Sequence, residues 1–317
     1  MSKIKTVFIV GPTASGKTDL SIKLAKKFGG EIISADSMQI YKGIHIASAA
    51  PDEDETEGIP HHLLEFLETD KQFSVADYVI LAREKIREIT ARGKTPIVVG
   101  GTGLYISALV DNTEFIEADT DLALRQRLEE EFDTFGGEEM LKKLSVIDSE
   151  TAARLHPNDK KRIIRAFEVY ETSGKTVTEQ NKESHNGEAF IEPLILGITY
   201  SDRQKLYDRI NMRVDIMLEK GLLEEAKTSF ESTNSKGGFQ AIGHKELYGY
   251  FEGTLSLEEA AENLKQQTRR YAKRQLTWFR GMENINWLYP DIDKDIIEKS
   301  ESLVREFLKL TKKEVVV

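Results

Sequence analysis

The stretch Thr6–Thr18, which reads TVFIVGPTASGKT, decides the fold that we expect for this chain. Its apolar residues 7–10 predict a short buried strand, and the next eight residues fit the phosphate-binding pattern G-x-x-x-x-G-K-[ST] at every fixed position. A helical pattern follows directly. In this context glycines let backbone N–H groups converge on an anion, and the start of the helix favours negative charge. The stretch therefore predicts an α/β protein with a phosphate-loop NTPase-like core and a parallel sheet.

We assign the binding of a phosphate or diphosphate group to the whole loop. Its Lys17 adds a positive charge, and the hydroxyl of Thr18 can hold Mg²⁺, so Mg²⁺ is the cofactor that we expect. The pattern leaves open which phosphate compound is bound. The predicted diphosphate-binding residues are Gly11, Pro12, Thr13, Ala14, Ser15, Gly16, Lys17 and Thr18.

Composition limits the possible classes of protein. The 317 residues carry a formal net charge of −10 and include no cysteine, so disulfides, thiolate zinc sites and a cysteine nucleophile are excluded. We recognise no signal peptide and no transmembrane run, and we expect a cytoplasmic protein. The acidic balance argues against a general nucleic-acid coat but allows a local basic site, and it is compatible with a monomer.

Two further predicted strands end in residues that suit chemistry. Residues 31–34 lead into Asp36-Ser37-Met38-Gln39, and ligands of open α/β sheets bind at the carboxyl ends of the strands. Asp36 is therefore a candidate for chemistry, although a helix cap or a turn would also explain it.

The second of these strands, residues 95–99, ends in glycines and Thr102. An NTP hydrolase usually carries an acidic residue there to hold Mg²⁺, so the glycines argue against a plain hydrolase. They indicate a ligand that lies close to the backbone and faces the Thr102 hydroxyl. The alternative is a packed strand–helix turn.

Residues 119–173 show only helical patterns, interrupted by glycines and Pro157. The last pattern begins with residues 160–165, KKRIIR, although basic residues are unfavourable at a helix start. These charges indicate an outside partner, or else a solvated face. A strand over 193–199 returns to the sheet. We therefore expect a core of residues 1–116 and 193–317 and a helical insertion of residues 117–192.

The C-terminal half adds two groups of cations. Arg209 and Arg213 are i,i+4 neighbours on a predicted helix, where their guanidinium groups suit a diphosphate or pair with neighbouring aspartates. A later helix, residues 257–279, has no acidic residue from Asn263 to Met282 but carries several cations among aromatic residues. Such cations contact nucleic-acid phosphates, or simply cover a surface helix.

Seven motifs together resemble one family, the bacterial tRNA dimethylallyltransferases. They occur in the family's order from Val7 to about Arg280, with His244 standing where the family has Tyr and Lys161 where it commonly has Gln. The motifs are GPTASGKT, SADSMQIYKG, PHHL, VVGGTGLY, RIIRAFEVYETSGK, QAIGHKE and RRYAKRQLTWFR.

The resemblance implies a reaction. A dimethylallyl group would pass from dimethylallyl diphosphate to N6 of the adenosine 3′-adjacent to the anticodon, in tRNAs that read codons starting with U. The product would be N6-isopentenyladenosine. The helical insertion would hold the anticodon stem-loop, and the adenosine would be flipped out of the loop.

The resemblance also implies roles for individual residues. Asp36 would accept a proton from the amine, and Thr102, Arg209 and Arg213 would act beside it on the donor. The residues implied in tRNA binding are Asp36, Ser37, Met38, Gln39, Thr102, Arg125, Lys161, Arg162, Ile163, Ile164, Arg165, Lys273 and Arg274.

Three other classes of protein would also carry the phosphate loop. A small-molecule kinase would use ATP and would need neither the insertion nor the basic helix. An adenylate isopentenyltransferase would prenylate free AMP or ADP. A non-catalytic RNA-binding NTPase switch would carry the acidic residue that is missing after Val99.

Overall fold

The computed structural model of the protein describes residues 3–113, 121–184, 189–232 and 241–310. The chain divides into two compact units, one formed by Met1–Val110 and Ala189–Val317 and the other by Asp111–Glu188. The sequence places the boundaries at 117 and 192. We describe each unit by itself.

The first unit is built on a parallel sheet with the strand order β3-β2-β4-β1-β5-β6, which confirms the predicted fold class. The sequence patterns located four of these strands and missed β3 and β6, which are too short to show a period. The strands are β1 (Ile4–Val10), β2 (Gly30–Ser34), β3 (His61–His62), β4 (Thr95–Gly100), β5 (Ile191–Ile198) and β6 (Ile285–Leu288).

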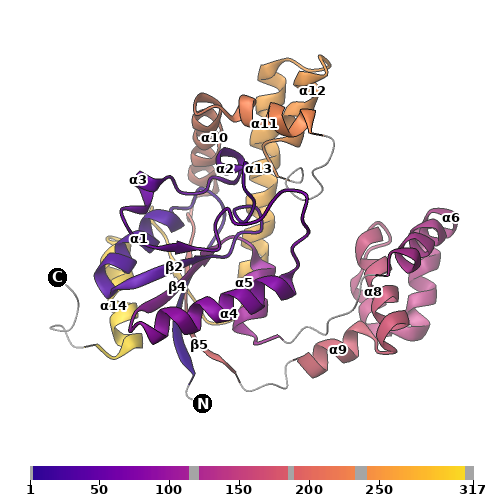
Figure 1. Ribbon diagram of the computed structural model, residues 1–317, viewed down its shortest axis with the longest axis horizontal. Helices are drawn as coiled ribbons and strands as arrows, with labels where there is room; N and C mark the ends of the chain where they lie inside the picture. The colour runs from indigo at the N-terminus through magenta and orange to yellow at the C-terminus, as the bar shows by residue number, and fades with distance from the viewer. Residues whose placement is uncertain (1–2, 114–120, 185–188, 233–240, 311–317) are drawn as a thin grey trace. The chain divides into compact units, whose positions relative to one another are not determined.

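Helices cover both faces of this sheet (Figure 1). Alternate residues of β1 divide between the faces: Phe8 and Val10 pack with α4 and α5, whereas Val7 and Ile9 pack with α1 and α14. The sheet is therefore buried on both sides, as parallel sheets are. These four helices are α1 (Lys17–Phe28), α4 (Val75–Ala91), α5 (Gly103–Val110) and α14 (Ile296–Leu308).

The remaining helices of this unit follow β2 and β5. Figure 1 shows α13 running from beside α5 to α11 and α12, and α10 packs against it. The sequence patterns predicted α10 and α13 and missed α11. These elements are α2 (His45–Ser48), α3 (Glu53–Thr56), α10 (Arg203–Glu219), α11 (Leu222–Glu231), η2 (Lys245–Leu247), α12 (Tyr248–Phe251) and α13 (Leu257–Arg280).

The described residues of the second unit form helices joined by short turns and loops, and this unit has a core of its own around Leu128, Met140 and Phe167. Gly136 has non-helical dihedral angles and kinks α6, so the break predicted at the glycine pair is present. Gly137 lies against Pro157, where a Cβ would come within 1.8 Å of the carbonyl oxygen. The helices are α6 (Leu122–Ile147), α7 (Ser149–Arg154), α8 (Lys160–Ser173) and α9 (Val177–Ser184).

In the part of the chain that the structure describes, no helix has the length and apolar character needed to cross a membrane.

Candidate active site

The phosphate loop joins β1 to α1 in a strained conformation that its glycines allow. Gly11 has φ 149°, and a Cβ there would lie 2.2 Å from the carbonyl oxygen of Ile198. Gly16, with φ 100°, occupies the N-cap position of α1 without a side-chain cap. The first amides of α1 therefore have no side-chain partner at the N-cap, which is the arrangement that favours anion binding.

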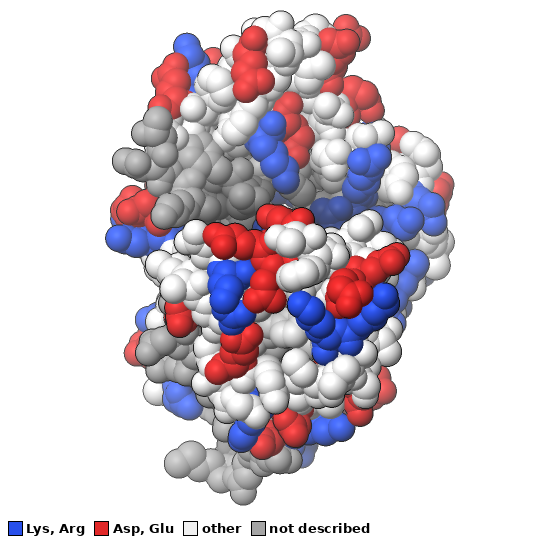
Figure 2. Space-filling model, turned by 90° about the vertical axis from the view of Figure 1, so that its right-hand side faces the viewer, with Lys and Arg blue, Asp and Glu red and all other residues white. Residues whose placement is uncertain are grey.

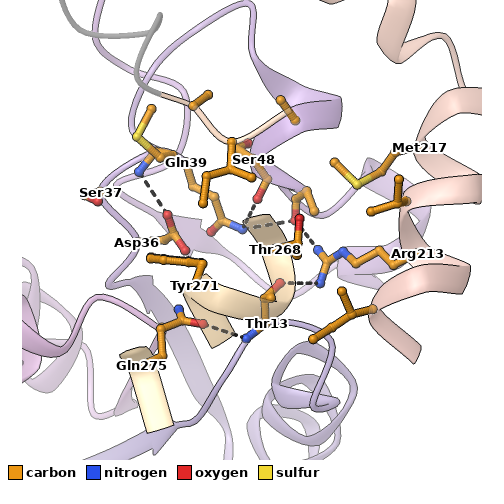
Figure 3. Close-up of a pocket in the computed structure, with 18 of the residues that line it drawn as sticks. Thr13, Asp36, Ser37, Gln39, Ser48, Arg213, Met217, Thr268, Tyr271 and Gln275 are labelled. Atoms are coloured by element: carbon orange, nitrogen blue, oxygen red, sulfur yellow. Dashed lines mark hydrogen bonds between the residues drawn. The ribbon is translucent and has the colours of Figure 1, made fainter. Parts of the chain in front are cut away.

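A glutamine from the far end of the chain fixes this loop. The side chain of Gln275 on α13 accepts a hydrogen bond from Thr13 N at 2.9 Å (Figure 3) and also donates to Gly101 O at 3.0 Å. Gln275 is only 5% exposed, and a Cβ on Gly101 would lie 2.1 Å from its amide nitrogen. The glycine turn after β4 and the phosphate loop are thus held together through one buried amide. The alternative interpretation of the glycine turn after β4, as a packed strand–helix connection, therefore describes part of its role.

Both arginines of α10 reach the phosphate loop. Arg209 Nε donates to Ala14 O at 2.9 Å, and Arg213 donates to Thr13 Oγ1 at 3.3 Å and to Ala49 O at 3.5 Å. Among the described residues neither arginine forms an ion pair with Asp208 or Asp215; Asp208 accepts from the Gln204 amide, and Asp215 pairs with Lys265.

Positive charge is concentrated and enclosed at this end of the site. The pKa of the Lys17 ammonium is lowered to about 7, first by burial and then by the charge of Arg213, while Asp36 opposes both. Burial also lowers the pKa of the Arg213 guanidinium. The Lys17 ammonium donates to Pro12 O at 2.7 Å. A diphosphate would supply the negative charge that this cluster lacks.

Asp36 follows β2 and lies in the same cavity wall. Its Oδ1 accepts from Met38 N at 2.9 Å, which fixes the carboxylate, and among the described residues it makes no other hydrogen bond, so Oδ2 is available. Tyr271 lies beside it on α13 (Figure 3), and burial followed by the charge of Asp36 raises the pKa of that phenol.

Thr102 lies next to the cavity but does not line it. Its Oγ1 accepts from Ser37 N at 2.9 Å and donates to Ser37 Oγ at 3.3 Å. Gln39 is similarly engaged, since its amide donates to Ala49 O at 3.0 Å. Thr102 and Gln39 therefore help to hold the cavity wall, and Gln39 also lines the cavity; their contacts to substrate stay predictions.

The cavity has a volume of about 310 Å³ and two chemically different ends. The polar end is formed by Thr13, Lys17, Thr18, Asp36 and Arg213, while apolar side chains form the other end. Of the apolar lining residues, Ala47, Val214, Met217, Ile242 and Leu264 pack in one cluster and Ala241 packs with Ala47, whereas Ile210 packs beside Ala14 of the phosphate loop.

Sequence reasoning missed the apolar end and Tyr271. The apolar residues come from α2, α10, α13 and the segment before η2, so only the fold brings them together. The available signal was that Ile210, Val214 and Leu264 lie on apolar stripes of predicted helices, and such stripes are ordinarily core.

The donors at the polar end fit Mg²⁺ held chiefly by a substrate. Thr18 is exposed and lines this cavity with Asp36. The described residues contain no group of three His, Cys, Asp or Glu that could cage a metal ion. Mg²⁺ commonly binds through one or two protein oxygens together with phosphate oxygens and water. The predicted ligand Thr18 therefore suits a diphosphate-bound ion.

The helical unit displays only some of the residues predicted to bind RNA. Lys161, Arg162 and Arg165 are exposed on α8. Ile163 and Ile164 are 0% and 2% exposed in the core of this unit, so we correct their assignment to RNA binding. The helical period explains the error, because a continuous run of six residues necessarily turns part of itself inward.

Arg125 and Arg165 in this unit share a buried acidic partner. The carboxylate of Glu168, a residue that is 5% exposed, lies 3.5 Å from Arg125 and 3.4 Å from Arg165. Lys161 and Arg162 make no ion pair among the described residues. Their charges are therefore free for an external partner.

The basic stretch of α13 is less uniform than its sequence indicates. Lys265 pairs with Asp215 and Arg269 pairs with Glu262, whereas Lys273 and Arg274 are exposed without an acidic partner in the described chain. Arg274 lines the cavity and lies over the ring of Tyr271, 5.6 Å from its centroid. Arg274, the cation of this stretch that lines the cavity, is thus without an acidic partner among the described residues.

Comparisons with known proteins agree with this geometry. The family model described as IPP transferase matches residues 39–282. The tRNA dimethylallyltransferase of Acetivibrio thermocellus is 48% identical over 94% of each chain, and that of Bacillus subtilis is 46% identical over 94% of this chain and 95% of its own.

Solved structures are also similar. The tRNA isopentenylpyrophosphate transferase of Bacillus halodurans superposes with a TM-score of 0.72 at 42% identity, covering 97% of both chains. A eukaryotic dimethylallyltransferase acting on tRNA gives a TM-score of 0.81 at 31% identity, over 99% of this chain and 82% of the other. The family match and the near-complete coverage by these relatives, together with the two-ended cavity, show that the chain belongs to the IPP transferase family.

Proposed function

We propose that this protein is a tRNA dimethylallyltransferase. It moves the five-carbon dimethylallyl group of dimethylallyl diphosphate to N6 of the adenosine 3′-adjacent to the anticodon, in tRNAs that read codons starting with U. The product is N6-isopentenyladenosine. The protein acts in the cytoplasm as a monomer.

One observation carries the proposal: the cavity joins a cationic phosphate-binding end to an apolar end. A prenyl diphosphate has the same division between a charged head and a hydrocarbon chain. Burying the five-carbon chain against residues such as Val214 and Leu264 is favourable by about 0.8 kcal/mol per CH₂ group. The diphosphate would then lie between the phosphate loop and the α10 arginines.

The reaction breaks the C1–O bond of the donor and forms a bond from C1 to N6. Negative charge grows on the departing diphosphate, and Lys17, Arg209 and Arg213 all have charges or donors directed at the phosphate loop. When bound at Thr18, Mg²⁺ supplies further positive charge to the diphosphate oxygens.

Asp36 suits the acceptor side of the reaction. An exocyclic adenine amine is a weak nucleophile that must lose a proton as its nitrogen is alkylated. The backbone amide of Met38 holds Asp36 Oδ1, and Oδ2 can accept that proton. Thr102 and Ser37 hold the loop that carries Asp36.

RNA binding must come from local clusters of cations. Figure 2 shows Lys and Arg side chains intermingled with Asp and Glu over the face that it presents. We assign RNA contacts to Lys161 and Arg162 in the helical unit and to Lys273 and Arg274 on α13, because these four are exposed without acidic partners in the described chain.

The alternative functions explain fewer of the observed features of the site. A small-molecule kinase has no use for an apolar end in its phosphate site. An adenylate isopentenyltransferase would share the cavity but would not need the unpaired cations of the helical unit.

A transfer assay tests the proposal. Labelled dimethylallyl diphosphate and Mg²⁺ are mixed with the protein and unmodified tRNA carrying adenosine 3′ of the anticodon. Parallel reactions contain AMP alone, or ATP without a prenyl donor. We expect label in tRNA, and its loss by a factor of about 10²–10⁴ in Asp36→Asn, the range typical of a lost general base.

The control is Asp70→Asn, which removes an exposed carboxylate outside the cavity. tRNA binding by Asp36→Asn should stay intact. Label in AMP and not in tRNA would reassign the protein to nucleotide prenylation, and ATP consumption without any transfer would reassign it to a kinase.

A further inference from the structure

Two segments that pack closely together, α2 and residues 241–243, form part of the apolar end of the cavity. Ala47 on α2, Ala241 and Ile242 all line the cavity, and Ala47 packs in the apolar clusters that include Ile242 and Ala241. The next residue, Gly243, has φ +123°, and a Cβ there would lie 3.2 Å from the Cβ of Ala47. Neither segment can move toward the other, and the cavity can deepen only if they separate.

A buried polar cluster on α11 holds these two segments together. The carboxylate of Glu225 accepts hydrogen bonds from Ile46 N at 2.7 Å and Ala47 N at 2.9 Å. The same carboxylate is 2.9 Å from Nε2 of His244, which therefore donates to it. His244 Nδ1 lies 2.8 Å from the hydroxyl of Ser229. The imidazole is 0% exposed, so every polar atom of the ring is used inside the protein.

The α2 wall needs such an anchor. This helix has four residues, and its N-cap, Ile44, supplies no side-chain cap. A helix of one turn is not stable by itself, so tertiary contacts must fix its position. Glu225 provides two of these contacts through the backbone amides of Ile46 and Ala47, beside those of Gln39 with Ser48 O and of His45 with Asp52. Nothing in the proposed chemistry otherwise requires a buried carboxylate–imidazole pair at this place.

The other end of α2 leads to the cationic end of the cavity. Ala49, directly after the helix, accepts from the Gln39 amide and from Arg213. The helix is therefore tied to the diphosphate end at its C-terminus and to α11 at its N-terminus. Its placement fixes the distance from the diphosphate site to the Ala47 wall.

We propose that Glu225 and His244 are positioning residues that set the depth of the apolar end, and thereby limit the prenyl chain that the cavity accepts to five carbons. The inference rests on the proposed prenyl transfer. A ten-carbon chain would have to displace α2 from the segment of residues 241–243, which breaks the hydrogen bonds of Glu225. The five-carbon chain leaves them intact.

Two substitutions of the same histidine separate this role from simple packing. In His244→Gln the side-chain amide nitrogen can take the place of Nε2 and keep the bond to Glu225. In His244→Asn the shorter amide reaches only the Nδ1 position and keeps the contact with Ser229. We expect the Asn variant to lose the clamp on α2 and the Gln variant to retain it.

The measurement is calorimetric titration with dimethylallyl diphosphate and with geranyl diphosphate, both with Mg²⁺ and without RNA. The wild type should prefer the five-carbon donor. The ratio of the two dissociation constants should fall about tenfold in His244→Asn and change less than twofold in His244→Gln. Glu225→Gln, which keeps one amide contact of α2, serves as a second variant if His244→Asn does not fold. Lys227→Gln, an exposed change on the same helix, is the matched control.

The inference would be overturned if the ratio of the two dissociation constants stayed at the wild-type value in both histidine variants and in Glu225→Gln. This holds even if the variants melt at a lower temperature, because the cluster would then have a purely structural role. A wild type without preference between the donors would overturn it as well. The transfer assay with tRNA tests the proposed function separately. A protein that prenylates no tRNA, but whose preference between the donors falls in His244→Asn and persists in His244→Gln, would refute the transfer to tRNA and still support the role of Glu225 and His244 in donor selection.

Discussion

Replacing Gln275 by methionine tests whether one buried amide couples the two glycine-rich turns of the active site. Methionine has a similar length and keeps the packing, but it can neither accept from Thr13 N nor donate to Gly101 O. Each buried group left without a partner costs about 1–3 kcal/mol. Because Thr13 borders the cavity, where water can replace part of its lost bond, we expect a total near the lower end, about 2–3 kcal/mol.

That loss should lower the melting temperature by about 4–12 °C, since 1 kcal/mol corresponds to about 2–4 °C for a domain of this size. The freed Thr13 amide should also loosen the phosphate loop and weaken the binding of inorganic diphosphate about tenfold, or about 1.4 kcal/mol. Thermal unfolding and calorimetric titration measure the two effects.

Gln266→Met on the same helix is the control, because Gln266 is exposed and its substitution should change stability by less than about 0.5 kcal/mol. If Gln275→Met melts like the wild type and binds diphosphate equally well, the amide does not couple the turns. A loss of stability with unchanged diphosphate affinity would reduce Gln275 to a packing role.

Three further predictions follow from other contacts. Gly100→Ala should destabilise the protein by more than about 3 kcal/mol, because its Cβ would lie 2.1 Å from the backbone oxygen of Ala35. The control Gly253→Ala places its Cβ where no atom lies within 4 Å and should cost about 1 kcal/mol. Equal denaturant midpoints for the two variants would contradict this prediction. Burial raises the pKa of Asp148, but hydrogen bonds led by that of Thr178 outweigh it and bring the pKa to about 2. The folded pKa lies below the unfolded value of 3.8, so this stabilisation of about 2 kcal/mol is present above pH 4 and is lost as the pH falls towards 2. The difference in unfolding free energy between the wild type and Asp148→Asn should therefore shrink over that window, and a constant difference would refute the assignment. Substituting both Lys161 and Arg162 by Gln should weaken tRNA binding and reduce the slope of log Kd against log salt concentration by about 2. The control Lys142→Gln should leave that slope unchanged. An unaltered slope in the double variant would exclude RNA phosphate contacts at Lys161 and Arg162.

The sequence predicts the parts of this site that depend on local geometry. The phosphate loop is recognisable because its glycines, lysine and threonine must occur at fixed spacing for the backbone to surround an anion. Asp36 is recognisable as a candidate because a polar residue directly after a buried strand lies at the ligand-binding edge of the sheet. Parallel strands of five or more residues, such as β1 and β4, also show their apolar character plainly. All of these signals lie within a few residues of one another.

Interactions between distant segments leave no such signal. Gln275 and Thr13 are 262 residues apart, and a single glutamine on a predicted helix looks like any solvated residue. The pairing of Lys265 with Asp215 is hidden for the same reason, although it removes one cation from the basic stretch of α13. The strands β3 and β6, of two and four residues, are too short to show a period. Ile163 and Ile164 show the opposite failure, since a motif matched by sequence order says nothing about which of its side chains face inward.

The two ends of the cavity place different demands on the chain, and this explains where sequence reasoning succeeds. The diphosphate end needs particular atoms, namely backbone amides, an ammonium and guanidinium groups, so its residue types are restricted at each position. The apolar end needs only a shape, and alanine, isoleucine, valine or leucine from any helix can form it. The specificity of such a wall must then come from the groups that hold it in place. In this protein those groups are polar and buried, and Glu225 and His244 are the pair that the fold places behind the wall.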